Sequence, residues 1–298
     1  MTKKIERFFD DAETRTPCLV VDLDRVVENH ACMAELMTWG EIFYAVKANP
    51  APEIIARLAA SGCAFDAASP SEVAACLKAG IAPDRISYGN TVKKLSDISF
   101  AAGQGVDLFA FDSVGEIEKL AAGAPGSSVV CRVVVSNDGA RWPLTRKFGC
   151  HSDEAVALLK CAAGAGLRPA GISFHVGSQQ TDPARWCEAI TLCADLFARA
   201  ADAGLSLDVL NLGGGFPVPY GDGAVPELET LSNMIDQALD EAFSGARPRV
   251  IVEPGRAIVA NAGVIRSEVI LVAERAYDTT ERWVYLDVGR YGGLAESG

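Results

Sequence analysis

The sequence predicts an α/β protein, a (β/α)8 TIM-type barrel with part of a C-terminal all-β domain. Between residues 41 and 256, short apolar runs rich in β-branched residues alternate with alanine-rich stretches of helical periodicity. Several of these stretches begin at a serine and end near a glycine, which are helix start and stop signals. After residue 256, two strand patterns follow without a helix between them. A doubly wound sheet stays open as the alternative, because alternation alone does not show closure.

The predicted elements follow each other in barrel order. Strands are expected at Ile42–Lys47, Ala64–Ala68, Ile86–Asn90, Leu108–Asp112, Val129–Val135, Gly171–Val176, Val209–Leu212 and Val250–Glu253. Helices are expected at Pro52–Ser61, Ser69–Ala79, Ser113–Ala122, Ser152–Ala165, Pro183–Ala203 and Glu227–Phe243. We therefore place a barrel domain at residues 24–260.

Both ends of the chain fall outside this repeat. Thr16–Asp22 is expected to form a strand that leads into a helix at Asp24–Thr38, and Gly263–Ala273 and Trp283–Val288 are expected to be strands. Residues 1–23 plus 261–298 would then form an incomplete β-domain. Two or three strands leave unpaired edges and do not close a small barrel, so we interpret the chain as C-terminally truncated.

Composition favours a cytoplasmic enzyme. The chain has 298 residues, 49% of them apolar, and a net charge of -12 with scattered basic residues, which gives no footprint for nucleic acid. No apolar run reaches the length of a membrane span or of a signal peptide core. The nine cysteines include no C-x-x-C pair and are expected to be mostly buried free thiols. The three histidines are not spaced like zinc ligands, so no metal is expected.

Polar residues stand where the predicted strands end, and barrel enzymes carry their chemistry at that face. In chain order they are Lys47, Asp66, Asn90, Asp112, His175, Gly213–Gly215 and Glu253. A strand-end aspartate is often only a helix cap, and for Asp112 this is the favoured interpretation. Lys47 alone would be read as a surface lysine. In a desolvated barrel mouth, however, a lysine is suited to attack an aldehyde carbon.

The loops after the last two strands are suited to phosphate. Glycines at Gly213–Gly215 let the backbone approach an anion, and Gly255-Arg256 adds a cation in the next loop. Barrels often bind phosphate at these two loops. A lysine, a phosphate cradle, an acid and an imidazole in one mouth together indicate a pyridoxal phosphate (PLP) site.

At these residues the sequence resembles the ornithine/diaminopimelate/arginine decarboxylase family of PLP enzymes, which has the alanine-racemase-like fold. The matching segments are Tyr44-Ala-Val-Lys47-Ala-Asn49, Phe65-Asp66-Ala-Ala-Ser69, Arg132, Lys147-Phe-Gly149, Phe174-His175-Val-Gly-Ser178, Leu212-Gly-Gly-Gly215-Phe-Pro217 and Glu253-Pro-Gly-Arg256. Residues 142–149 and 287–296 resemble bacterial ornithine or lysine decarboxylases more than the diaminopimelate branch.

The resemblance implies a role for each matching residue. Lys47 would be the Schiff-base lysine, His175 would stack on the cofactor ring, and Glu253 would pair with the pyridine nitrogen. The residues implied to hold the phosphate are Ser178, Gly213, Gly214, Gly215, Gly255 and Arg256. Asp66 and Arg132 would line the site near the cofactor.

The implied reaction is the decarboxylation of L-ornithine to putrescine by a homodimer with its active site at the interface. Racemases of this fold group place an arginine where this chain has Glu253, so decarboxylation is favoured over racemisation. In the family, a Cys-Asp segment, a substrate-binding aspartate and a phosphate-binding tyrosine lie beyond the point where this chain ends. We therefore expect the chain as given to bind the cofactor but to decarboxylate poorly.

Three alternatives stay open. The first is another substrate: lysine, diaminopimelate, arginine or carboxynorspermidine. The second is a non-catalytic binding protein of the antizyme-inhibitor kind, which the presence of Lys47, His175 and Glu253 disfavours. The third is a small single-domain PLP-homeostasis protein, which the strands after Arg256 disfavour.

Overall fold

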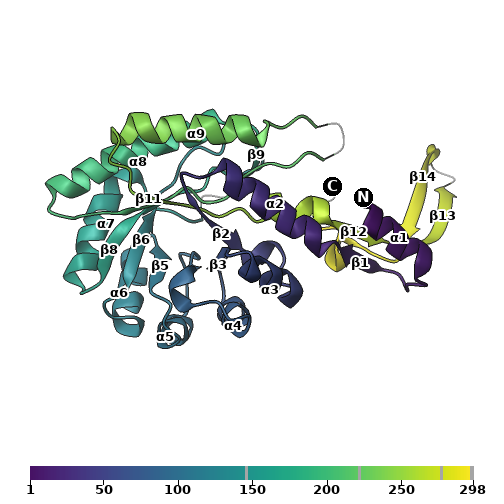
Figure 1. Cartoon of the computed structure of the whole chain (residues 1–298), viewed down its shortest axis with the longest axis horizontal. Helices are drawn as coiled ribbons and strands as arrows, with labels where there is room; N and C mark the ends of the chain where they lie inside the picture. Colours follow the sequence, from purple (N-terminus) through teal and green to yellow (C-terminus); the bar gives the residue numbers. More distant parts are fainter. Residues whose placement is uncertain (145–146, 221–222, 276–277, 296–298) are drawn as a thin grey trace. The chain divides into compact units, whose positions relative to one another are not determined.

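The computed structural model describes residues 1–144, 147–220, 223–275 and 278–295, and it divides into two compact units. Unit 2 is Val26–Val259, and unit 1 joins Met1–Arg25 to Ala260–Gly298 (Figure 1). Three residues of the motifs quoted above, Thr145, Arg146 and Glu296, lie outside the described residues.

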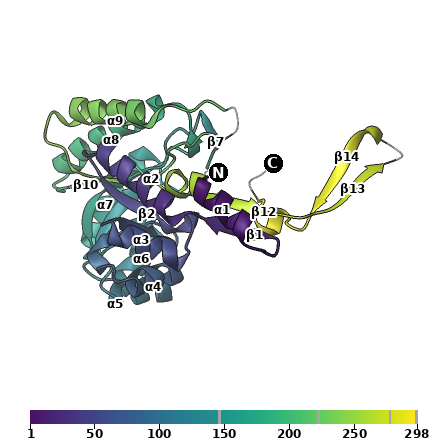
Figure 2. The same cartoon turned by 45° about the vertical axis from the view of Figure 1, so that its right-hand side comes forward.

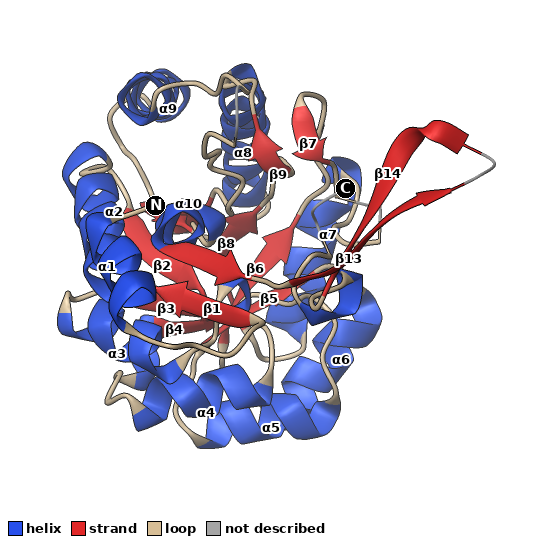
Figure 3. Ribbon diagram, turned by 90° about the vertical axis from the view of Figure 1, so that its right-hand side faces the viewer, coloured by secondary structure: helices blue, strands red, loops and turns tan. Residues whose placement is uncertain are grey.

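Unit 2 is built on a closed parallel barrel, so the predicted fold class is confirmed and the doubly wound sheet is excluded. Around the barrel the strands run in the order β10-β11-β2-β3-β4-β5-β6-β8. Their bounds are β2 Glu41–Ala45, β3 Ala64–Ala67, β4 Ile86–Tyr88, β5 Leu108–Phe111, β6 Ser128–Arg132, β8 Arg168–Ser173, β10 Val209–Asn211 and β11 Arg249–Val252. Labelled strands β2 to β6 lie inside a ring of helices (Figure 3).

Helices follow the barrel strands and cover them. They are α2 Leu23–Leu36, α3 Pro52–Ala60, α4 Pro70–Lys78, α5 Leu95–Gly103, α6 Val114–Gly123, α7 Ser152–Gly164, α8 Ala184–Asp202 and α9 Leu228–Phe243, with the single turn α10 Arg256–Val259. Helix α4 shows how the sequence sets these bounds, because the Ser69 side chain accepts from the Glu72 amide and Pro70 occupies the first turn. Helix α5 lacks such a side-chain cap and was not predicted. Helices α8 and α9 run alongside each other (Figure 1).

The barrel is filled by apolar side chains that point inward from the strands. One buried cluster consists of Phe43, Ala64, Ala110, Val130, Val209 and Ile251. Each large apolar side chain buried here stabilises the fold by roughly 1.5–3 kcal/mol. This packed core leaves the carboxyl ends of the strands as the face where polar groups gather.

A buried ion pair joins two barrel strands at that face. Strands β4 and β5 pair only at Ser87↔Leu108 and Tyr88↔Phe109. Beyond this point the Lys93 ammonium donates to the Asn90 carbonyl at 2.9 Å and to the Ala110 carbonyl at 2.7 Å. Its charge is balanced by Glu116, whose carboxylate lies 2.9 Å away, and both side chains are almost fully buried. The ammonium thus replaces ladder hydrogen bonds where the strands separate.

Unit 1 contains two antiparallel strand pairs and one helix. Strand β1 (Cys18–Val21) pairs with β12 (Gly263–Arg266), and β13 (Val269–Arg275) pairs with β14 (Asp278–Leu286), seen as one hairpin in Figure 2. The helix α1 (Lys3–Asp11) was not predicted for a segment placed in an all-β domain. Its cap is Thr2, whose hydroxyl accepts from the Ile5 amide and donates to Asp22. In the described part of the chain, no helix has the length and apolar character to cross a membrane.

Candidate active site

The carboxyl ends of the barrel strands surround a cavity of about 270 Å³. Five predicted site residues line it: Lys47, Asp66, Arg132, His175 and Glu253. The structure therefore brings together side chains that are up to two hundred positions apart in the chain. The remaining predicted residues, which are Ser178, Gly213–Gly215, Gly255 and Arg256, do not line this cavity and belong to the adjoining loops.

Lys47 was predicted as the last residue of a strand, but it lies just beyond the strand that the structure contains. Strand β2 ends at Ala45, and Lys47 belongs to a 3-10 turn, η1 (Val46–Ala48). The Tyr44 hydroxyl donates to the Asn49 carbonyl at 3.0 Å, which closes this turn before Pro50. Lys47 lines the cavity but is exposed, so the expectation of a desolvated lysine is wrong.

Glu253 is held in place by a neighbour that the sequence did not single out. The Asn211 amide, at the end of β10, donates to Glu253 Oε1 at 2.5 Å. The side-chain Oδ1 of Asn211 accepts from the Gly213 amide at 2.8 Å, and the Glu253 amide donates to the Gly213 carbonyl at 2.8 Å. These bonds fix the Glu253 carboxylate in the cavity wall. A polar residue at the end of an apolar run was the available signal for Asn211.

Asp66 is a buried carboxyl group next to Glu253. It accepts a hydrogen bond of 2.9 Å from the Ser87 hydroxyl. Burial and the Glu253 carboxylate raise the pKa of Asp66 well above its usual range, while Lys47 acts in the opposite direction. Gly89 leaves room for it, since a Cβ there would lie 2.2 Å from Asp66 Oδ1.

His175 is a neutral imidazole in this environment. Burial, helped by the Lys47 and Arg132 cations, lowers the pKa of His175 well below 6.5. The Gly177 amide donates to His175 Nδ1 at 3.0 Å, so the ring proton is assigned to Nε2. Burial also lowers the pKa of Arg132, whereas the carboxylates of Glu253, Asp112 and Asp66 favour its charge.

Asp112 does not act as the expected helix cap. Its carboxylate accepts from the Gly149 amide at 2.8 Å, across the loop that follows β6. This bond joins the β5 end to the loop of Phe148, a residue that also lines the cavity and lies under the Arg132 guanidinium at 5.7 Å. The loop is thus tied to the strand ends by a side chain, which no local pattern predicts.

The three glycines Gly213–Gly215 are required because there is no room for a side chain at these positions. A Cβ would lie 2.3 Å from the Phe174 carbonyl oxygen at Gly213, 2.6 Å from the Glu253 carbonyl oxygen at Gly214, and 2.4 Å from the Gly177 carbonyl oxygen at Gly215. Gly213 and Gly215 also have φ values of +67° and +101°, which glycine adopts most readily. Gly255 packs the next loop against the Lys47 turn, since a Cβ there would lie 2.8 Å from the Ala48 Cβ.

A further residue, Trp142, pairs with Ser178 through its backbone and contacts Arg256 through its ring. Ser178 belongs to a short strand, β9 (Ser178–Gln180), which pairs antiparallel with β7 (Ala140–Trp142), and Trp142 stands opposite Ser178. The Arg256 guanidinium lies over the Trp142 ring at 4.8 Å from its centroid. Neither short strand was predicted.

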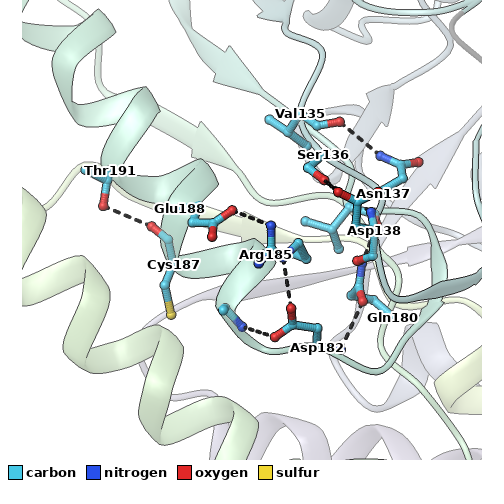
Figure 4. Close-up of polar contacts among 12 residues, drawn as sticks. Val135, Ser136, Asn137, Asp138, Gln180, Asp182, Arg185, Cys187, Glu188 and Thr191 are labelled. Carbon is cyan, nitrogen blue, oxygen red and sulfur yellow. Dashed lines mark hydrogen bonds and ion pairs between the residues drawn. The ribbon is translucent and has the colours of Figure 1, made fainter.

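The loops that carry β7 and β9 are fixed by polar contacts (Figure 4). The Gln180 side-chain amide donates to the Asp138 and Val176 carbonyls at 3.0 and 2.9 Å, and its oxygen accepts from the Asp182 amide. Arg185, on helix α8, pairs with Asp182 just before the helix and with Glu188 within it. A second cavity of about 970 Å³ lies beside these loops and shares Arg132, Phe148 and His175 with the first.

Among the side chains of the described segments, no cluster of three histidine, cysteine or acidic residues is placed to hold a metal ion. All nine cysteines are free thiols. Five of them are buried, namely Cys63, Cys76, Cys131, Cys150 and Cys193, whereas Cys32 and Cys161 are exposed.

The residues fit pyridoxal phosphate as a bound group. A carboxylate, an imidazole and an amine line one cavity, and the triple glycine brings no side chain to the adjoining loop. Ser173 adds a buried hydroxyl without a hydrogen-bond partner among the described residues, in the wall of the same cavity. Sequence reasoning missed this serine, because it lies within a strand.

Comparisons with known proteins agree with this geometry. Residues 23–260 match the family model of the pyridoxal-dependent decarboxylase pyridoxal binding domain. The lysine/ornithine decarboxylase of Selenomonas ruminantium is 39% identical over 277 residues, which cover 93% of this chain and 69% of that protein. The antizyme inhibitor 2 of Xenopus laevis is 32% identical, over 90% of this chain and 59% of that protein.

Solved structures have the same fold. The structure of SrLDC in complex with PLP and cadaverine has a TM-score of 0.89 at 36% identity, covering 99% of this chain and 74% of that one. The arginine decarboxylase of Paramecium bursaria Chlorella virus has a TM-score of 0.90 at 27% identity, covering 99% and 78%. The chain thus spans between about half and about two thirds of the length of the curated relatives it matches.

Proposed function

Because this chain belongs to the pyridoxal-dependent decarboxylase family, we propose that it decarboxylates a basic amino acid with PLP as its cofactor. The proposed substrate is L-ornithine and the proposed product is putrescine. The observation that carries the proposal is the meeting of Lys47, His175 and Glu253 around one cavity beside a glycine cradle. The Selenomonas ruminantium relative, named for both lysine and ornithine, supports this substrate class.

PLP, when bound, supplies an electron sink for the pair released as the bond between Cα and the carboxylate breaks. The residues of this chain make that sink effective. Glu253, oriented by Asn211, would accept a hydrogen bond from the pyridine nitrogen and keep a proton on it. Lys47 would bond covalently to the cofactor, and its exposed position at the cavity leaves it accessible for that bond.

His175 and the two other predicted cavity residues would shape the environment of the ring. A neutral His175 can pack flat against an aromatic cofactor without adding a second cation beside Arg132. Asp66 and Arg132 would line the site near the cofactor. The phosphate would be held by the Gly213–Gly215 loop together with Ser178, Gly255 and Arg256, with the Gly214 and Gly215 amides as the donors, because the Gly213 amide already donates to Asn211 Oδ1.

Two measurements test the proposal. PLP titration should give the visible absorbance of lysine-bound cofactor in the parent chain and not in Lys47→Ala. Release of CO2 should then be compared for ornithine, lysine, arginine and diaminopimelate, with ornithine expected to have the highest kcat/KM. Binding of PLP to Lys47→Ala with unchanged absorbance would contradict the role of Lys47. A higher kcat/KM for lysine would move the substrate assignment to that amino acid.

The rival function is non-catalytic binding, as the name of the antizyme inhibitor 2 relative suggests. The complete set of cavity residues favours the enzyme over this rival. A parent chain that binds no PLP at saturating concentration would favour the rival.

We further propose a cytoplasmic homodimer with its active site at the subunit interface. The nine free thiols agree with a reducing compartment. Sedimentation equilibrium of the PLP-loaded protein tests the oligomeric state.

A further inference from the structure

We propose that Trp142 is a positioning residue of the phosphate site, which holds the Arg256 guanidinium in the orientation that receives an anion. The inference rests on the proposed function, because it takes Arg256 as a phosphate ligand. Three observations carry it: the stacking of Arg256 on Trp142, the pairing of Trp142 with Ser178, and the anchoring of that strand pair to the triple glycine.

The first observation is the contact itself. The Arg256 guanidinium carbon lies 4.8 Å from the centroid of the Trp142 ring, within the range of a cation–π interaction, and tryptophan is the strongest aromatic partner for a cation. Arg256 Nη1 also donates to the Tyr220 hydroxyl at 3.4 Å. A stacked guanidinium exposes its N–H edge, which is the edge that binds phosphate oxygens. Stacking therefore selects a binding orientation from the many rotamers of a long side chain.

The second observation is that the backbone of Trp142 stands opposite Ser178 in the β7–β9 pair. Ser178 comes from the loop after β8, and Arg256 comes from the loop after β11. Trp142 thus contacts two proposed phosphate ligands from separate loops, one through its backbone ladder and the other through its ring. A shift of Trp142 would therefore change the distance between Ser178 and Arg256.

The third observation links this pair to the cradle. The Gln180 amide, at the end of β9, donates to the Gly215 carbonyl at 3.0 Å. The Gln180 side chain donates in addition to the Val176 carbonyl and to the Asp138 carbonyl, and Asp138 is labelled beside it in Figure 4. Strands β7 and β9 therefore form a frame that fixes Trp142 relative to the triple glycine. Trp142 does not line the cavity with Lys47 and Glu253, so its effect should be confined to the phosphate.

The experiment compares PLP with pyridoxal, which has the same ring and aldehyde but lacks the phosphate. Dissociation constants are measured by absorbance for the parent, Trp142→Leu and Trp142→Tyr. Leucine keeps apolar bulk without an aromatic face, and tyrosine restores the face. We expect Trp142→Leu to weaken PLP binding by about two- to thirtyfold, with pyridoxal unchanged and with recovery in Trp142→Tyr.

A double-mutant cycle with Arg256→Ala completes the test. If Trp142 acts through Arg256, the Trp142→Leu change should weaken PLP binding far less in the Arg256→Ala background. Trp283→Ala, an exposed tryptophan on β14, serves as the matched control and should leave both constants unchanged. Equal weakening of PLP and pyridoxal, unchanged PLP affinity, or additive effects would each overturn the proposal.

A failure of the proposed function would look different, because the parent would then bind neither ligand with lysine-bound absorbance. Thermal unfolding of each variant without ligand confirms that it is folded. If Trp142→Leu is unfolded, Trp142→Met takes its place, because methionine also lacks an aromatic face, and full PLP affinity in that variant would count against the inference.

Discussion

The Asn211 side-chain amide donates to Glu253 Oε1 at 2.5 Å, and the same Asn211 accepts from the amide of Gly213. One side chain therefore connects the acid of the cavity to the first glycine of the cradle. Because both the nitrogen and Oδ1 of the Asn211 side chain are hydrogen-bonded, the Glu253 carboxylate is held in place before any ligand binds.

This contact predicts a graded loss of activity. Glu253→Gln should lower decarboxylation by about a hundredfold or more, because a neutral amide cannot keep the proton on the pyridine nitrogen. Asn211→Ala should lower it by about tenfold, since the carboxylate is retained but no longer oriented. The rate of CO2 release under saturating PLP measures both. An Asn211→Ala rate equal to that of the parent would show that the orientation of Glu253 does not matter.

His175 predicts a loss of stability in acid. Its pKa in the folded chain is lowered below 6.5, so the unfolded chain binds more protons as the pH falls through 6.5 and below. The free energy of unfolding of the cofactor-free protein should therefore decrease in this window. In His175→Gln the decrease should be smaller. Because burial also lowers the pKa of His30, a His30→Gln variant measures the share of that residue in the same denaturation series.

Asp66 predicts the opposite sign. Its folded pKa is raised above 3.8, so its contribution to stability is present in acid and is lost as the pH rises through the folded value. Asp66→Asn, which cannot ionise, should make the cofactor-free protein more stable than the parent near neutral pH. The difference should vanish toward about pH 4. Asp195→Asn on the surface of helix α8 is the control, and urea denaturation at several pH values is the measurement.

The glycine cradle predicts an asymmetric response to alanine. Gly214→Ala would bring a Cβ to 2.6 Å from the Glu253 carbonyl oxygen, so the loop must shift and PLP affinity should fall by at least about tenfold. Gly164→Ala lies in helix α7 with nothing within 4 Å of the added Cβ, and it should raise stability by about 0.5–1 kcal/mol with PLP affinity unchanged. Equal PLP affinity in the two variants would contradict the steric explanation.

The Lys93–Glu116 pair predicts that removing one of the two charges destabilises the protein more than removing both. Lys93→Met takes the 2.9 Å partner from the buried Glu116 carboxylate, which keeps only the partly exposed Lys119, and should reduce the free energy of unfolding by about 3 kcal/mol. The double variant Lys93→Met with Glu116→Leu removes both charges and should recover a large part of that loss. Denaturant unfolding of the three proteins is the measurement. A double variant less stable than Lys93→Met would refute this explanation.

The predictable parts of the molecule were those with a local pattern. Apolar runs located all eight barrel strands, because strands buried on both faces need continuous apolar sequence, and they placed Lys47 and Glu253 next to strand ends. Local pattern failed for helices α5 and α1. It also failed where a role depends on a distant partner. Asn211 matters because of Glu253, and Trp142 matters because of Arg256, and no spacing in the chain records either contact.

The triple glycine also limits how this protein can change over evolutionary time. Three consecutive positions border carbonyl oxygens so closely that no side chain can be introduced at any of them without moving a neighbouring loop. If this loop binds phosphate as proposed, natural variation in the strength of phosphate binding is restricted to the side chains of neighbouring loops, among them Ser178 and Arg256. A lineage that lost the need for a phosphorylated ligand would be free to replace these glycines, so their replacement in a homologue would mark a change of ligand.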